Sequence, residues 1–336
     1  MEEAMRRHFF NGRGDGSGEP HDKKNCHWCQ IRAFKTHQEY PISIVTDPTH
    51  NAVLQPSFEF RETSIRGADV KPTNKEFLSG CDCKNGENCQ YNDCTCLQDV
   101  DDDSSEDEDE VDFLPRKKVY AYHTHGARAG HLRSKILTSR NPIYECHKEC
   151  KCPPTCPNRV VERGRQIPLQ IFYTGNRGWG VRSPVDIKKG QFVDTYIGEV
   201  ITAEEANRRR NQSHITQKKD VYLFALDKFS DPESYDERLT GPPLEVDGEF
   251  MSGPSRFINH SCDPSLRIFA RVGDHAEKHC HDLAFFAIRD IPRGEELTFD
   301  YVDGVEDSEM DALDPEKQKD MTRCLCGSEN CRGYLW

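Results

Sequence analysis

The chain has 336 residues, of which 35% are hydrophobic and 31% charged, and its formal net charge at pH 7 is −13. This composition suffices for one large or two smaller folded domains, and the acidic balance disfavours non-specific binding to nucleic acid, which requires a basic surface. No stretch has 18 consecutive apolar residues and residues 1–20 carry no apolar signal-peptide core, so we expect a protein inside the cell with no membrane span.

Residues 1–24 contain four alternating glycines among polar side chains and predict a flexible tail. The segment 25–80 is more apolar, and Ile42–Val45 and Phe58–Phe60 predict short strands in an N-terminal wrapping segment. Cys26 and Cys29 form a lone Cys-x-x-Cys pair that is two ligands short of a zinc site. Packing is the favoured interpretation of this pair, and a metal site is the alternative.

Residues 81–157 contain nine cysteines in two clusters with short spacings, a pattern that chance rarely produces. In an intracellular chain such cysteines indicate metal ligands before disulfides. The nine are Cys81, Cys83, Cys89, Cys94, Cys96, Cys146, Cys150, Cys152 and Cys156. Ten carboxylates lie between the clusters, from Asp99 to Asp112, so the rest of the chain has a net charge of only −3. We expect residues 99–115 to be a disordered acidic spacer, with a phosphorylated regulatory segment as the alternative.

The segment 158–302 alternates short apolar runs with Gly and Pro, which is typical of a mostly β domain. Strands are predicted at 169–173, 191–201, 221–226, 266–272, 283–288 and 296–299. One helix is predicted, because Thr202 is a good N-cap, Glu205 follows three residues later, and helix-favouring residues continue to Gln212.

The C-terminal part begins with an acidic, polar segment, 303–323, that we interpret as a flexible linker. Residues 324–336 return to cysteines: Cys324, Cys326 and Cys331 are three ligands, one short of a closed tetrahedral zinc site, and Cys262 is the obvious fourth. Cys280 fits no ligand pattern, and we interpret it as an ordinary small apolar residue or a free thiol. The stretch Arg256–Pro264, which contains Cys262, would therefore be held to the C-terminal tail by a metal ion.

Within that stretch, Asn259 and His260 offer amide and imidazole groups that can bind a polar ligand such as a purine; a plain polar turn is the alternative. Three motifs follow one another along the chain: Arg-Phe-Ile-Asn-His-Ser-Cys-Asp-Pro from Arg256, Glu-Leu-Thr-Phe-Asp-Tyr at 296–301, and the cysteines of 324–331. Together they closely resemble the SET-domain protein lysine methyltransferases. Arg-Gly-Trp-Gly at 177–180 and the nine cysteines narrow the resemblance to the subfamily with pre-SET and post-SET zinc modules, which methylates lysine 9 of histone H3.

The resemblance covers nearly all of residues 25–336 and extends to the filamentous-fungal members required for DNA methylation. It implies a mainly β protein with few short helices, in which a SET fold of small curved sheets around a pseudoknot is flanked by pre-SET (81–157) and post-SET (324–336) modules. It also implies a nuclear, chromatin-bound enzyme that directs heterochromatin formation. A catalytically silent, zinc-scaffolded chromatin-binding module is the alternative, and a zinc nucleic-acid binder is disfavoured by the charge.

Four structural zinc ions are implied, three in the pre-SET module and one in the post-SET module. Three tetrahedral ions need twelve coordination bonds, and nine thiolates supply them if six bind once and three bridge. Such a cluster would have a formal charge of −3, which nearby Arg, Lys or backbone N–H groups should offset. Metal binding should also provide much of the folding energy of this cysteine-rich module.

S-adenosylmethionine is the implied methyl donor, with S-adenosylhomocysteine as its product. The resemblance assigns its binding to Arg177, Gly178, Trp179, Tyr222, Arg256, Asn259, His260 and Leu325. Gly178 and Gly180 would let the backbone approach the ligand closely, although Gly-Trp-Gly alone could be only a turn.

An aromatic channel is implied for the substrate lysine, whose amine must lose its proton before it attacks the methyl group. Desolvation and the neighbouring sulfonium both lower the lysine pKa, so no carboxylate base is required. Tyr301 and Tyr196 are the implied catalytic tyrosines. The channel is assigned to Phe299, Tyr196, Tyr222, Phe224 and Trp336, although core packing is the favoured interpretation of Phe224 taken alone. Phenylalanine at 299 implies trimethylation, since tyrosine there would leave less room.

The histone H3 tail is the implied partner, bound as an added strand on an exposed sheet edge. The candidate is the run ending at Ala225, Leu226 and Asp227, where Asp227 can meet an arginine beside the target lysine. The chain has no obvious chromodomain, so other chromatin factors must recruit it. We expect a monomer without strong direct binding to DNA.

Overall fold

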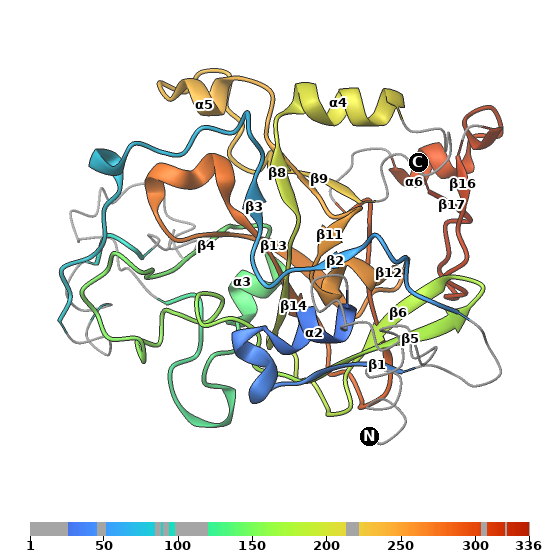
Figure 1. The fold of residues 1–336 in the computed structure, drawn as a ribbon, viewed down its shortest axis with the longest axis horizontal. Helices are drawn as coiled ribbons and strands as arrows, with labels where there is room; N and C mark the ends of the chain where they lie inside the picture. Colours follow the sequence, from blue (N-terminus) through green and yellow to red (C-terminus); the bar gives the residue numbers. More distant parts are fainter. Residues whose placement is uncertain are drawn as a thin grey trace, which may run out of the picture.

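A computed structural model describes residues 26–45, 52–84, 89, 94–97, 120–212, 222–303, 308–319 and 321–335. The predicted tail, the acidic spacer and Trp336 lie outside these residues. Within them, strands dominate and the helices are short, which confirms the predicted mainly β class (Figure 1). Of the helices in these ranges, none combines the length and the apolar character that a membrane crossing requires.

The largest sheet has nine strands and forms the body of the molecule. Its main path runs β1-β5-β6-β15-β13-β14-β7, with β12 paired to β15 and β4 paired to β13. The strands are β1 (Ile42–Val45), β4 (Ile143–Tyr144), β5 (Leu169–Gly175), β6 (Gly178–Arg182), β7 (Phe192–Tyr196), β12 (Asn259–His260), β13 (Leu266–Val272), β14 (Asp282–Ala287) and β15 (Glu296–Phe299).

A second sheet of four strands, in the order β3-β8-β10-β9, carries helix α4 (Ala203–Gln212). Its strands are β3 (Ile65–Arg66), β8 (Glu199–Ile201), β9 (Leu223–Ala225) and β10 (Glu245–Asp247). Two strand pairs complete the β structure, β2 (Glu59–Phe60) with β11 (Met251–Ser252) and β16 (Thr322–Arg323) with β17 (Tyr334–Leu335).

The remaining helices lie in the connections between strands. The α-helices are α2 (His27–Arg32), α3 (Ser134–Thr138), α5 (Glu237–Thr240) and α6 (Ser308–Leu313). The 3-10 helices are η1 (Lys35–Gln38), η2 (Lys75–Phe77), η4 (Gly126–Arg128), η5 (Pro254–Phe257), η6 (His275–Cys280) and η7 (Lys317–Lys319). The segment predicted as a linker, 303–323, therefore contains helical turns, and its Ala312 is buried against the protein.

Most predicted strands form where expected, because their apolar residues become buried. The run 266–272 is β13, and it pairs antiparallel with β14, whose residues 283–287 are all buried. Helix α4 begins as its capping signal predicts, since the Glu205 N–H donates to Thr202 Oγ1 at 3.3 Å. The possible turn at Gly-Trp-Gly is in fact strand β6, and the tight turn lies just before it, between Gly175 and Gly178, where both glycines have positive φ.

Three groups of buried residues hold the fold together. The main core lies between the two larger sheets and the N-terminal segment, and includes Phe58, Tyr196 and Phe299. A second core lies between α3 and the outer face of β13 and β14, around Phe286. The third consists almost entirely of the nine cysteines of 81–156 with Leu97 and Tyr120. Such a core has little apolar side chain to bury, so the cysteine module needs another source of stability.

Candidate active site and metal centres

Two of the sequence motifs meet through the pairing of β12 with β15. Asn259 lies opposite Thr298 and His260 opposite Phe299 in this parallel pair. Immediately beyond it, the Tyr301 N–H donates to His260 Nδ1 at 3.2 Å, and the two rings lie 5.4 Å apart, edge to face. The polar turn and the Phe-Asp-Tyr motif therefore form a single site.

Glu296 forms hydrogen bonds with two of the residues predicted to bind the methyl donor. Its carboxylate accepts from Asn259 Nδ2 at 2.8 Å and from the Arg177 guanidinium at 2.5 Å. Asn259 Nδ2 also donates to the Trp179 carbonyl at 3.2 Å. A Cβ on Gly180 would lie 2.7 Å from Thr174 Cγ2 and 2.9 Å from Glu296 Oε1, so a larger residue there would displace both side chains. Sequence reasoning missed Glu296; its only signal was a charged residue opening a strand that is otherwise buried.

Arg256 packs against the ring of Tyr222. Its Cζ is 4.0 Å from the centroid of the Tyr222 ring, and its guanidinium donates to the carbonyls of Gly248 at 3.2 Å and Glu249 at 3.3 Å. The charge of Arg256 is therefore satisfied by backbone carbonyls and aromatic faces rather than by a carboxylate. This arrangement fixes the connection between β10 and β11 against η5.

The predicted channel aromatics contact one another in a row. Ring centroids are 4.5 Å apart for Tyr196 and Phe224, 5.8 Å for Phe224 and Phe299, and 4.6 Å for Phe299 and Tyr301. The Tyr196 hydroxyl donates to the Tyr222 carbonyl at 2.9 Å, and the Tyr301 hydroxyl donates to the Ile258 carbonyl at 2.7 Å. Phe224 is thus part of the same aromatic row, as well as packing against the core.

Burial raises the pKa of both tyrosines well above the ordinary value of a phenol. For Tyr301 the neighbouring Tyr222 adds to the effect of burial, and the positive charge of Arg256 opposes it. Both phenols therefore remain protonated at neutral pH and act as hydrogen-bond donors. Neither is suited to be a general base.

His260 connects this site to the C-terminal cysteines. Burial lowers the pKa of His260 to about 4 despite the nearby Asp300 carboxylate, so the ring is neutral at pH 7. Since Nδ1 accepts from the Tyr301 N–H, Nε2 carries the proton and faces Cys262 Sγ at 3.3 Å. His260 is then a hydrogen-bond donor to the Cys262 sulfur.

The C-terminal tail lies against the central turn that contains Cys262. Cys262 Sγ lies 3.9 Å from Cys324 Sγ, and the Arg332 N–H donates to Cys262 Sγ at 3.4 Å. Ligand atoms of His260, Cys262, Cys324 and Cys326 all lie within 4.8 Å of one another, and the Cys331 thiol contacts that of Cys324. The Arg332 guanidinium also donates to both oxygens of Asp300, at 2.8 and 2.6 Å, beside Tyr301.

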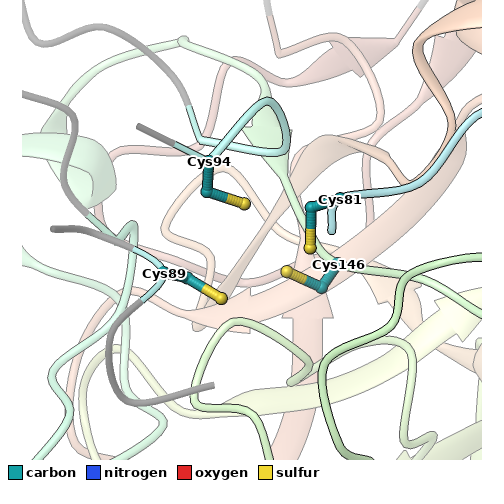
Figure 2. Close-up of side chains that lie close together, drawn as sticks. All are labelled: Cys81, Cys89, Cys94 and Cys146. Atoms are coloured by element: carbon teal, nitrogen blue, oxygen red, sulfur yellow. The ribbon is translucent and has the colours of Figure 1, made fainter. Parts of the chain in front are cut away.

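The nine cysteines of 81–156 form three overlapping groups that could hold metal ions. The groups are Cys81, Cys89, Cys94 and Cys146; Cys81, Cys96, Cys146 and Cys150; and Cys89, Cys146, Cys152 and Cys156. In the first group the four sulfurs point toward a common centre (Figure 2). Cys83 is buried in the same cluster.

The sulfur spacing in this cluster fits a tetrahedral metal site. Metal–sulfur bonds of about 2.3 Å place the sulfurs of a tetrahedron about 3.8 Å apart. Sulfur pairs here lie at 3.5 Å (Cys96–Cys150), 3.9 Å (Cys146–Cys156) and 4.0 Å (Cys89–Cys156), too far apart for disulfides. None of the sixteen cysteines, all of which lie among the described residues, forms a disulfide.

Polar groups around the cluster would offset the negative charge of bound thiolates. Arg159 Nη2 lies 3.3 Å from Cys152 Sγ, and the backbone N–H groups of Cys81 and His147 donate to Cys150 Sγ at 3.4 and 3.3 Å. This matches the expected need for cationic and N–H donors around a cluster with excess thiolate. Cys26 and Cys29, in contrast, belong to none of the ligand groups found among the described residues, and Cys280 packs against the main core.

The predicted peptide-binding run ends at the edge of the four-stranded sheet. In the described part of the chain, β9 pairs with β10 alone, so its other edge is open. Ala225 and Asp227 are exposed, whereas Leu226 is buried and its N–H donates to the Leu244 carbonyl at 2.7 Å. Leu325 is 51% exposed in the tail, and Trp336 lies beyond the described residues.

Comparisons with known proteins agree with this geometry. A family model for the SET domain matches residues 178–302, and one for the Pre-SET motif matches residues 34–159. The chain is 60% identical over 336 residues, covering 100% of both chains, to a Neurospora crassa protein described as histone-lysine N-methyltransferase, H3 lysine-9 specific dim-5. The chain belongs to the SET-domain family.

Solved structures of SET-domain proteins show the same fold. The structure of the Neurospora SET domain protein DIM-5, a histone lysine methyltransferase, matches with a TM-score of 0.70 and 55% identity, covering 85% of this chain and 100% of that one. Arabidopsis thaliana SUVH6, solved in complex with SAM, matches with a TM-score of 0.62 and 25% identity over 95% of this chain and 60% of that one. The predicted SET fold is therefore confirmed.

Proposed function

We propose that this protein transfers methyl groups from S-adenosylmethionine to lysine 9 of the histone H3 tail. The proposal is supported by the full-length similarity to an H3 lysine-9 specific enzyme. The observation that carries it is the contact between β12 and the Phe299–Tyr301 segment, because it brings a group of polar side chains and a row of aromatic rings to one place. A methyl donor and an amine acceptor require this combination.

The aromatic row favours a neutral lysine, the form that can attack a methyl group. Deprotonating a free lysine, with a pKa of about 10.4, costs roughly 3 kcal/mol at pH 8. An environment built from Phe224, Phe299 and two protonated tyrosines disfavours the charged ammonium by desolvation and so lowers that cost. Because Tyr301 keeps its proton, we assign to it the role of orienting the reacting groups. Tyr196 would hold the Tyr222 carbonyl in place through its hydrogen bond.

The donor would be held by the residues that the resemblance assigns to it, namely Arg177, Gly178, Trp179, Tyr222, Arg256, Asn259, His260 and Leu325. When bound, S-adenosylmethionine supplies an electrophilic methyl on a positively charged sulfur. Gly178 leaves open space beside the backbone, and the Arg177–Glu296 pair positions a cation that can meet the carboxylate of the donor.

Zinc fits the donor sets of both cysteine regions, since thiolates are ligands that this ion prefers. We propose three ions among the nine cysteines of 81–156 and one in the tail. For the tail site, the tautomer of His260 makes it a hydrogen-bond donor to Cys262, which favours Cys331 as the fourth ligand beside Cys262, Cys324 and Cys326.

The H3 tail would add as a strand to the open edge of β9. Backbone groups of β9 supply the hydrogen bonds, and the exposed Asp227 carboxylate, next to that edge, suits an arginine that precedes the target lysine. An acidic protein also attracts a basic tail at a distance.

Methyl transfer to H3 peptides tests the proposed function. Purified protein is incubated with labelled S-adenosylmethionine and peptides of the H3 tail in which lysine 9 is intact or replaced by arginine, and products are analysed by mass spectrometry. We expect transfer to the intact peptide and none to the replaced one. Binding of the peptide without transfer would instead support a silent chromatin-binding module.

A further inference from the structure

The N-terminal segment, which precedes the SET domain, places an aromatic ring against Arg256. The Cζ atom of Arg256 lies 4.9 Å from the centroid of the Phe58 ring and 5.0 Å from that of Phe257, in addition to its closer contact with Tyr222. Phe58 is only 3% exposed, so this contact is shielded from water. A cation held between aromatic faces in a dry environment is strongly fixed in position.

Two elements of the N-terminal segment determine where Phe58 lies. Strand β2 begins at the next residue and pairs in parallel with β11, and the Glu59 N–H donates to the Phe250 carbonyl at 2.8 Å. Helix α2 holds the other side, since the imidazole of His27 donates to the Phe58 carbonyl at 2.8 Å. Figure 1 shows β2 beside β11, and α2 packs on β2. Strand β11 leads into η5, which contains Arg256.

From Arg256 the contacts continue into the aromatic row. The guanidinium stacks on the Tyr222 ring and holds the Gly248 carbonyl, and the Gly248 N–H donates to the Tyr222 carbonyl at 2.9 Å. The same carbonyl accepts from the Tyr196 hydroxyl. A displacement of Arg256 would therefore move both the ring of Tyr222 and the hydrogen-bond partner of Tyr196.

We propose that Phe58 is a positioning residue of the lysine channel, which acts by pressing the Arg256 guanidinium against the Tyr222 ring. Phe58 does not touch the reacting groups. It makes the shape of the site depend on a segment that lies outside the matched SET domain, residues 178–302. This inference rests on the proposed methyl-transfer function and adds a residue that the channel needs.

The chain contains a matched control for Phe58, because Phe60 is equally buried in the same cluster. Both side chains are 3% exposed, their rings are 5.0 Å apart, and both contact His27 and Phe257. The Phe60 ring meets Phe257 at 6.0 Å, whereas the cation contact of Arg256 is with Phe58. Replacing either residue by leucine thus removes similar packing, but only one change removes the cation contact.

The test compares Phe58→Leu and Phe60→Leu with wild type in methyl transfer to an H3 peptide and in thermal unfolding. Transfer by the wild type is established first, so that failure of the proposed function is recognised separately. We expect similar melting temperatures for the two variants and a loss of roughly three- to thirty-fold in kcat/KM confined to Phe58→Leu, the range that a desolvated cation–π contact corresponds to. Equal losses of kcat/KM in both variants would overturn the proposal.

A second set of variants keeps the proposal testable if Phe58→Leu folds poorly. Phe58→Met fills the space with an unbranched chain but has no ring, and is combined with Arg256→Lys in a double-mutant cycle. If Phe58 acts through Arg256, the two effects on kcat/KM are less than additive, and Phe58→Met adds little to Arg256→Lys. Fully additive losses would mean that Phe58 acts elsewhere, and would contradict the inference.

Discussion

Glu296 and Phe299 lie three residues apart on β15 and serve the two halves of the site. Glu296 holds Arg177 and Asn259 on the side where the methyl donor is expected, whereas Phe299 lies between Phe224 and Tyr301 on the side where the substrate lysine is expected. A single short strand would therefore set the distance between the proposed donor and acceptor sites. Substitutions on it should affect the product as well as the rate.

Phe299→Tyr should shift the product from trimethyl-lysine toward mono- and dimethyl-lysine. The Phe299 ring is buried between neighbouring rings, so an added hydroxyl must take space or hold a water where further methyl groups would lie. Mass spectrometry of an H3 peptide over a time course measures the three products. The first methyl transfer should retain a rate within about threefold of wild type, and an unchanged product ratio would refute the assignment of Phe299.

Asp194 predicts a pH dependence of stability that is separate from catalysis. Burial raises the pKa of Asp194 to about 6 against the ordinary 3.8, although Arg165 and the Thr195 N–H oppose this, and its Oδ2 has no hydrogen-bond partner among the described residues. Because the pKa is raised in the folded state, ionisation costs stability, from nothing below pH 4 to about 3 kcal/mol above pH 6.

Asp194→Asn should therefore stabilise the protein at pH 8 by up to about 3 kcal/mol, with the gain shrinking toward zero as the pH falls to 4. Urea unfolding of both proteins at several pH values measures the difference. A gain that does not change with pH would show that the carboxylate does not titrate in this range.

At the scale of elements, helix α4 is held on its sheet by charge rather than by apolar packing. Ala206 is its one buried residue, whereas Arg209 donates to Glu199 on β8 and to Asp247 on β10, both at 2.7 Å. Asp247 is almost fully buried and adjoins Gly248, which supports Tyr222 and Arg256. The ion pairs of Arg209 thus connect helix α4 to the residues around Tyr222 and Arg256.

Arg209→Met should destabilise the protein by about 2 kcal/mol, because it leaves the buried Asp247 carboxylate without its cation. Arg208→Met is the matched control: Arg208 is more than half exposed and pairs within the helix, with Glu205 and Gln212, so its loss should cost less than about 0.5 kcal/mol. Chemical denaturation compares the two. Equal losses would show that the sheet contacts of Arg209 contribute no more than a surface pair.

Elements with a strong local pattern were predictable from the sequence, whereas those defined by distant partners were not. The run 266–272 forms a strand because its apolar residues become buried when it pairs with neighbouring strands such as β14. Thr202 caps α4 through a hydrogen bond with a residue only three positions away. Strand β6 was missed because glycines predict a turn, and only pairing with β5 and β15 makes them a strand. Glu296 and Phe58 were missed for the same reason, since their partners are distant in sequence.

For the whole molecule, a buried arginine connects the cysteine module to the catalytic sheet. Arg271 on β13 donates to Glu145, which precedes Cys146, and to Glu162 and Asp282. Strand β4 adds backbone pairing to β13 at the same place. The cysteine module is therefore continuous with the sheet that carries the site, and the tail is attached separately through Cys262.

Removing ligands from the two metal regions should accordingly have different effects. Cys326→Ser should remove one zinc ion and lower the rate of methyl transfer by more than about 100-fold. It should leave most of the thermal stability, because only the tail is released from the Asn259–His260 turn. Cys146→Ser should lose several ions and fold poorly, since Cys146 belongs to all three ligand groups of its module and that module has little other core. Elemental analysis, methyl transfer and thermal unfolding measure these outcomes.

Cys280→Ser is the control for both, because Cys280 is a partly buried thiol that packs against the main core and lies outside the ligand groups. It should keep the full zinc content and most of the activity, at a modest cost in stability. If Cys326→Ser kept wild-type activity, the tail site would not be needed for an assembled active site. If Cys280→Ser also lost zinc, the losses would reflect general unfolding rather than ligand removal.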